Sequence, residues 1–241
     1  MADSGSKTMR QIAVESPAAI AVLEKYRLDF CWAGDKSLEA AAAGAGIPLE
    51  TILCEMGSAL TTCRAEQADW NTAGLDTLMQ HIVVRHHEYL RKELPLMERL
   101  LARARLTRGR ADASTLAPLE KVFHFFRREL ENHLRREEEV LFPLIRQLET
   151  ASKSGAELPR FPFGPITNPI GIMEEDHDAE RRQMQKMLVL TGNYTGPAEA
   201  TNVFDSLFRR IEALELDMRL HVHLEDHILF PRVGVLEASS W

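Results

Sequence analysis

His133-Leu134-Arg135-Arg136-Glu137, which runs on to Leu141-Phe142-Pro143, is the stretch that decides the fold, because the chain repeats its pattern. The second copy is His221-Val222-His223-Leu224-Glu225, and it runs on to Leu229-Phe230-Pro231 at the same offset. A helix places a histidine and a carboxylate four residues later on one face, about 5–6 Å apart at Cβ. A single such pair is usually a solvated ion pair. Two copies with the same tail indicate an internal repeat, and we predict that each copy supplies two metal ligands.

Apolar residues at three- and four-residue steps predict four long amphipathic helices in the second part of the chain. The first begins near Leu75, the second near Pro118, the third is capped by Asn168-Pro169, and the fourth carries the second copy of the repeat. No segment alternates for long enough to predict a strand. We therefore predict an all-α protein in which residues 72–236 form an antiparallel four-helix bundle.

The second predicted helix shows how the repeat meets the apolar face. Its steps place Phe126, Glu129, His133, Glu137 and Val140 on one side. Burying a histidine or a carboxylate without a partner costs several kcal/mol, so an apolar face should not contain them unpaired. A metal ion inside the bundle resolves this conflict. The alternative is a bundle with buried polar networks and no metal.

Residues 1–66 predict a separate small helical domain. Ser16-Pro17 is typical of a helix start, Ser37 caps a second short helix, and Pro48 begins a third. A loop, residues 28–36, precedes Ser37. A polar stretch then leads to the predicted bundle.

Composition limits the classes of partner and compartment. A net charge of −7 offers no basic surface for nucleic acid, and no apolar stretch reaches the roughly 20 residues that a membrane helix needs. The first residues carry no apolar signal core. Three cysteines, Cys31, Cys54 and Cys63, are an odd and sparse set that fits a reducing compartment. We expect a cytoplasmic protein without a nucleic-acid or membrane partner.

Each half of the predicted bundle contains the same set of ligand types. His87 precedes His133 by 46 residues, and His177 precedes His221 by 44, which suggests two related helix pairs. The expected metal ligands are His87, His133, Glu137, His177, His221 and Glu225. Structural zinc prefers thiolates, and calcium and magnesium prefer oxygen ligands. Imidazoles with carboxylates suit iron or manganese, so we predict a di-iron centre of two iron ions bridged by Glu137 and Glu225.

The other histidines are expected to lie outside the centre. His86 and His87 are adjacent, so only one should face the core, and His87 shares a face with Leu90 and Leu94. The remaining four, expected at the surface or in ordinary packing, are His81, His124, His223 and His227.

An acid stands four residues before each repeated histidine, Glu129 before His133 and Asp217 before His221. On the same face and one turn earlier, a carboxylate can accept the second N–H of an imidazole and fix its tautomer. A polar route for iron is a second possible role. The alternative is that both are ordinary solvated acids.

The chain resembles the haemerythrin-like di-iron proteins in three features: the two repeats, the stretch His81–His87, and Glu175-Asp176-His177-Asp178. The resemblance implies that the predicted bundle is haemerythrin-like. More narrowly, the chain resembles the iron–sulfur cluster repair di-iron family (RIC, ScdA/YtfE type). Ordinary haemerythrins carry His-x-x-x-His on one helix, whereas Arg181 follows His177 at that spacing here. The stretch 25–31 is similar to the small N-terminal domain of the repair family. That family has two adjacent cysteines in this loop, where this chain has Cys31 and Trp32.

The resemblance implies a stress-responsive protein that restores iron–sulfur clusters damaged by nitric oxide or oxidants, by supplying iron. Its partners would be damaged or apo iron–sulfur proteins, with nitric oxide or oxygen as a small ligand, and it would be a monomer or a homodimer. The main alternative is a protein that binds or reduces nitric oxide, and an oxygen-binding haemerythrin is a third. Cys31 is a candidate catalytic nucleophile or transient iron ligand, and the alternative is a partly buried structural cysteine.

Overall fold

The computed structural model describes residues 5–62, 69–107, 113–195 and 202–238. These residues are helical apart from turns, loops and one isolated bridge between Thr8 and Ser37, which confirms the predicted all-α class. The chain divides into two compact units, residues 1–74 with 222–228, and residues 75–221 with 229–241. The predicted domain limits, 1–66 and 72–236, stay predictions. Within the described ranges no helix combines the length and apolarity required to cross a bilayer.

Four short helices build the N-terminal part: α1 (Met9–Glu15), α2 (Pro17–Lys25), α3 (Leu38–Ala45) and α4 (Leu49–Thr62). The sequence did not predict α1. It begins at a capping box, in which the Thr8 hydroxyl accepts from the N–H of Gln11 and the Gln11 side chain accepts from the N–H of Thr8. The predicted cap at Ser37 is confirmed, because its hydroxyl accepts from the N–H of Ala40 at 3.1 Å. The loop between α2 and α3 is anchored by Phe30, which is fully buried.

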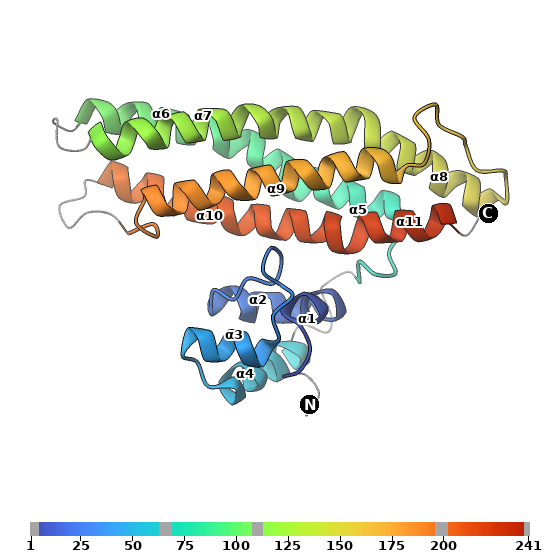
Figure 1. Cartoon of the computed structure of the whole chain (residues 1–241), viewed down its shortest axis with the longest axis horizontal. Coiled ribbons are helices and arrows are strands. Elements are labelled where there is room, and N and C mark those ends of the chain that lie inside the picture. The colour runs from blue at the N-terminus through green and yellow to red at the C-terminus, as the bar shows by residue number, and fades with distance from the viewer. Residues whose placement is uncertain (1–4, 63–68, 108–112, 196–201, 239–241) are drawn as a thin grey trace. The chain divides into compact units, whose positions relative to one another are not determined.

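Four long helical segments lie side by side as a bundle (Figure 1), as predicted. The first comprises α5 (Leu75–Ile82), η1 (Val83–His87) and α6 (Glu88–Thr107), and the second comprises α7 (Ala113–Arg136), η3 (Glu137–Leu141) and α8 (Phe142–Ser154). The third is α9 (Thr167–Leu190), and the fourth comprises α10 (Asn202–Leu224), η4 (Glu225–Leu229) and α11 (Phe230–Ala238). Helix α7 packs against both α6 and α9, and α5 packs against α8.

Two helix starts differ from the prediction. The second segment begins at Ala113, so Pro118 lies inside α7, where it removes one backbone hydrogen bond near the helix start. The third begins at Thr167 and has no side-chain cap. Asn168 lies within this helix, and its side-chain amide donates to the carbonyl of Phe163 at 2.9 Å.

The three η segments are π-helical turns, which the sequence analysis did not predict. In η3 the N–H of Phe142 donates to the carbonyl of Glu137, five residues back. The next residue, Pro143, has no N–H to donate to the carbonyl of Glu139, so the α-helical ladder is already interrupted there. A π turn therefore sacrifices fewer backbone hydrogen bonds at this point than it would in an uninterrupted α-helix. Pro231 stands at the same place after η4, which gives the shared Leu-Phe-Pro tail a structural meaning.

The wide turn corrects one predicted position. Val140, expected on the inward face, is 51% exposed. Leu141 takes its place in the core beside Phe142. A π turn needs more residues than an α turn to return to the same face, so the inward position moves one residue along the chain.

Candidate metal centre

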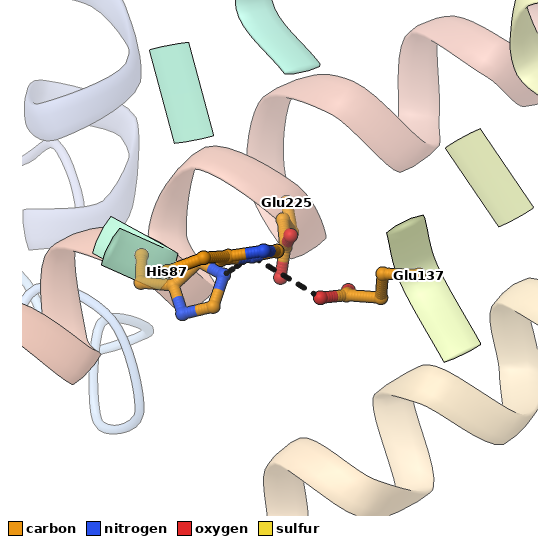
Figure 2. Close-up of side chains that lie close together, drawn as sticks. His87, Glu137 and Glu225 are labelled. Carbon is orange, nitrogen blue, oxygen red and sulfur yellow. Dashed lines mark hydrogen bonds and ion pairs between the residues drawn. The ribbon is translucent and has the colours of Figure 1, made fainter. Parts of the chain in front are cut away.

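The six predicted ligand residues gather in one place, and each is at most 2% exposed. Their ligand atoms form two groups of four within 4.8 Å of one another: His87, Glu137, His221, Glu225, and His133, Glu137, His177, Glu225. Both groups share the two carboxylates that begin the π turns. Figure 2 shows Glu137 and Glu225 converging on the imidazole of His87. Their role as metal ligands stays a prediction at this point.

The imidazoles meet in two pairs, each through the same ring nitrogen. The Nε2 atoms of His87 and His221 lie 3.1 Å apart, and those of His133 and His177 lie 3.2 Å apart. Glu137 contacts both pairs. Its Oε2 is 3.4 Å from His87 Nε2, and its Oε1 is 3.3 Å from His133 Nε2.

The donor set fits a pair of metal ions. Neither oxygen of Glu137 makes a hydrogen bond within the described chain, although the carboxylate is fully buried. Burying a carboxylate in this way is costly unless a cation or a donor compensates it. Imidazole nitrogens and shared carboxylate oxygens are ligands that iron, manganese and zinc accept. The arrangement is therefore suited to two cations that share Glu137 and Glu225.

Glu138, which the sequence analysis missed, orients the first pair. Its Oε1 lies 2.6 Å from His87 Nδ1 and also accepts from Arg91 Nη2 at 2.7 Å. These hydrogen bonds, first that of His87, lower the pKa of Glu138 and keep it ionised. An ionised carboxylate can only accept, so it favours the proton on Nδ1 and leaves the Nε2 lone pair facing the centre. The sequence contained one sign of this role, namely that Glu138 directly follows the predicted ligand Glu137.

The carboxylate beside His133 is Asp176, and not Glu129 as predicted. Asp176 Oδ2 lies 3.5 Å from His133 Nδ1 and accepts a second contact from Arg136. Burial opposes the charge of Asp176, but these two neighbours lower its pKa. The Glu129 side chain is 46% exposed and accepts from Arg128. The exposed Glu129 carboxylate forms an ion pair with Arg128, and not with His133. A part for Glu129 in iron passage stays a prediction.

The prediction that only one of His86 and His87 faces the core is wrong, because both are buried. The π turn η1 widens the helix at this point and turns two consecutive side chains inward. His86 Nδ1 lies 3.1 Å from Asp217 Oδ1, and its ring stacks on that of His221 at a centroid distance of 5.5 Å. Asp217 was expected beside His221 itself. The structure instead places its hydrogen bond on His86, and the ring of His86 packs against the ring of His221.

Charge is strongly coupled around Glu137. Burial opposes a charge on His133, but Glu137 and Glu180 outweigh it and raise the pKa of His133 well above its usual value. Burial also opposes the charge of Glu137, yet His133 and His87 lower its pKa well below the usual value. Both shifts favour a protonated His133 next to an ionised Glu137. Metal binding would displace that proton.

Glu180 is a second residue that the sequence analysis missed. It is buried one turn after His177 on the inner face of α9, and neither of its oxygens has a hydrogen-bond partner among the described residues. Burial raises its pKa. Its spacing of three residues from His177 was the available signal, because residues three apart share a helix face.

The other predicted positions lie outside both groups. Cys31 is 2% exposed, and its carbonyl accepts from Arg10 Nη2 at 3.3 Å. Cys54 is exposed, and Cys63 lies outside the described residues. His81, His124, His223 and His227 do not join the metal-binding groups found among the described residues. Burial, with the nearby His227, lowers the pKa of His223 to about 3.

Comparison with known proteins agrees with this geometry. The hemerythrin HHE cation binding domain matches residues 78–233, and ScdA_N, described as a domain of unknown function, matches residues 5–60. Proteins named iron-sulfur cluster repair protein YtfE from Citrobacter koseri, Shigella boydii serotype 4 and Escherichia coli O8 are each 31% identical to this chain over 226 residues. These matches cover 92% of this chain and 94% of each relative. The chain therefore belongs to the iron–sulfur cluster repair family of the YtfE type, which carries a hemerythrin cation-binding domain.

Proposed function

We propose that the chain holds two iron ions and donates iron to damaged or apo iron–sulfur proteins in the cytoplasm. One iron is held by His87 and His221 and the other by His133 and His177, with Glu137 and Glu225 bridging. The single observation that carries this proposal is that two four-residue groups share both carboxylates. The name of the relatives, iron-sulfur cluster repair protein, supports the choice of iron and of the recipient class, and the match covers 94% of each relative.

The residues around the proposed iron ligands suit an iron ion that is bound and later released. Glu138 and Asp176 hold imidazoles from behind, so the ligands keep their orientation when the ion is absent. The proton on His133 can return when iron departs, because Glu137 and Glu180 stabilise it there. Ligand protonation thus offsets part of the cost of releasing the ion.

The first test is metal content, followed by transfer. Anaerobically loaded protein should hold two irons per chain and should restore activity to an apo iron–sulfur enzyme. His133→Ala and Glu225→Ala should lose both properties. Glu139→Ala is the matched control, since Glu139 is an exposed acid two residues after Glu137. Fewer than two irons in fully loaded protein, or cluster repair by the His133→Ala variant, would contradict the proposal.

Nitric oxide binding is the second candidate function. Each group offers four protein ligand atoms, and iron commonly accepts six, which leaves positions for a small ligand. Stoichiometric binding of nitric oxide without any transfer of iron to an apo enzyme would favour this function over donation. Reduction of the gas would be seen as catalytic consumption with an added electron donor.

Cys31 is proposed as a transient iron ligand during transfer. It forms no disulfide within the described residues and lies on the loop between α2 and α3, although its side chain is buried in this conformation. Cys31→Ser should leave two irons per chain and slow their transfer to the apo enzyme. Transfer at the wild-type rate would assign Cys31 a packing role only.

A further inference from the structure

The phenylalanine of each Leu-Phe-Pro tail lies against a predicted metal ligand. The ring of Phe142 is stacked on the imidazole of His87, with centroids 6.0 Å apart and planes at 18°. The ring of Phe230 is stacked on the imidazole of His177, with centroids 6.1 Å apart and planes at 6°. Both distances fall in the range of offset-stacked aromatic pairs. The two tails therefore make the same contact in the two halves of the bundle.

Each of these contacts joins the two helical segments of one half. Helix α8, which begins with Phe142, packs against α5, and η1 with His87 follows directly after α5. Helix α11, which begins with Phe230, packs against α9, which carries His177. In each half, the segment with the repeat supplies the aromatic ring and the other segment supplies the histidine beneath it. The ligand that the repeat does not itself contain is thus held by the tail of the repeat.

The π turn brings the phenylalanine to the metal side of its helix. Phe142 stands five residues after Glu137, and Phe230 stands five residues after Glu225. In an α-helix, five residues turn the chain by about 500°, so the fifth side chain would point about 140° away from the carboxylate. In η3 the N–H of Phe142 donates to the carbonyl of Glu137, and this wider turn returns the phenylalanine nearer to the face of the carboxylate. Both carboxylates and both phenylalanines are accordingly buried.

A stacked ring restricts a motion that a hydrogen bond leaves open. The hydrogen bond from His87 Nδ1 to Glu138 runs along the N–H of the imidazole, so the imidazole could still tilt about that direction. Phe142 covers one face of the same imidazole, and at 1% exposure it is itself held in the core. The tilt is therefore restricted, and His87 Nε2 stays aimed at Glu137 Oε2, 3.4 Å away.

We propose that Phe142 and Phe230 are positioning residues of the metal centre. Each holds one imidazole, that of His87 or that of His177, in the orientation that a divalent metal ion requires. The tail is then a functional part of the repeat, because its proline permits the π turn, and the π turn directs the phenylalanine onto the histidine of the other segment. This inference rests on the proposed function in one respect, namely that two divalent metal ions occupy the centre.

The test is Co(II) binding, which requires no iron–sulfur partner. Co(II) is titrated into the metal-free protein and followed by its visible absorption, and competition with a coloured chelator gives the affinity. Phe142→Leu keeps an apolar side chain and removes the ring face. It should bind one of two Co(II) ions about tenfold more weakly than wild type, with altered absorption bands, because His87 no longer keeps one orientation. Phe230→Leu should weaken the other Co(II) ion, and the double variant should weaken both.

Phe123→Leu is the matched control. Phe123 is fully buried in α7, and its one ring contact among the described residues is with His124, which is not a predicted ligand. This variant should bind two Co(II) ions with the wild-type affinity and spectrum. Phe142→Tyr keeps the ring face and should also bind as the wild type does. Urea unfolding of the metal-free proteins shows that the compared variants are folded.

The positioning role is overturned if Phe142→Leu binds two Co(II) ions with the affinity and spectrum of Phe123→Leu. It is also overturned if Phe142→Tyr binds as weakly as Phe142→Leu, since the ring face would then not be the feature that matters. These outcomes are separate from failure of the proposed function. Wild-type protein that shows the expected effects of both phenylalanines but restores no cluster enzyme would contradict iron donation and leave the positioning role intact.

Discussion

The Nε2 atoms of His87 and His221 face each other at 3.1 Å in the centre of the bundle. Glu138 accepts from the other nitrogen of His87, so the Nε2 of that ring carries a lone pair. His221 presents its own Nε2 to the same point. A cation between them satisfies both rings, which makes the hydrogen bond of Glu138 a determinant of metal affinity.

We predict that Glu138→Gln weakens metal binding about 10- to 100-fold, the usual effect of losing a carboxylate that orients a ligand histidine. The amide can present its N–H₂ group to His87 and so allow the wrong tautomer. Competition of Co(II)-loaded protein with a coloured chelator measures the affinity. Glu139→Gln, at the next residue and exposed, should leave affinity unchanged. Equal affinities for the two variants would contradict the role of Glu138.

The buried pair of His86 and Asp217 should behave as one energetic unit. His86→Leu leaves the buried Asp217 with only the Arg85 guanidinium at 3.5 Å, and Asp217→Leu leaves His86 buried without its carboxylate. Each single change should destabilise the metal-free protein by about 1–3 kcal/mol. The double variant should cost less than the two single costs added together. Urea unfolding of the four proteins gives the coupling energy. Additive costs would show that the 3.1 Å contact contributes nothing.

The sequence was sufficient for the parts of the site that depend on local geometry. His133 with Glu137, and His221 with Glu225, share a face because i and i+4 positions always do on a helix. The matching positions of His87 and His177 followed from the internal repeat. The structure brings all six side chains within two small groups. Amphipathic periodicity was likewise enough to predict four long helices.

What could not be predicted depends on how the helices meet. A π turn departs from the regular α-helical period, so the inward place of His86 and the outward place of Val140 were not visible in a regular helical pattern. Glu138 contacts His87 from another helix. Spacing along one helix predicts Glu129 near His133, but it does not show which acid on a neighbouring helix lies there, and the structure places Asp176 at that position.

Buried His223 should make the protein sensitive to acid. Its pKa of about 3 in the folded chain lies below the usual value of 6.5, so the unfolded chain takes up a proton first as the pH falls. Stability from this group is complete above pH 6.5 and is lost as the pH falls from 6.5 towards 3. The loss by pH 5 should be about 2 kcal/mol, at 1.36 kcal/mol per pH unit.

Comparison with His223→Leu isolates this effect. The free energy of unfolding of the metal-free proteins is measured by urea titration at pH 7 and pH 5. Wild type should lose about 2 kcal/mol more than the variant over this interval, since leucine cannot take up a proton. His124→Leu is a control at a largely exposed histidine. If the variant and the wild type lose the same amount, His223 does not remain neutral in the fold.

Glu180 should lower the stability of the metal-free protein, because its carboxyl group is buried and neither oxygen has a hydrogen bond among the described residues. Glu180→Leu should therefore stabilise the metal-free chain by about 1–3 kcal/mol, the typical cost of an unsatisfied buried polar group. Asp178→Leu, at an exposed acid on the same helix, should change stability by less than about 0.5 kcal/mol. Urea unfolding in the presence of a chelator measures both. A destabilised Glu180→Leu variant would contradict this cost, and it would mean that the attraction between Glu180 and a protonated His133 stabilises the fold by more than burial of the carboxyl group destabilises it.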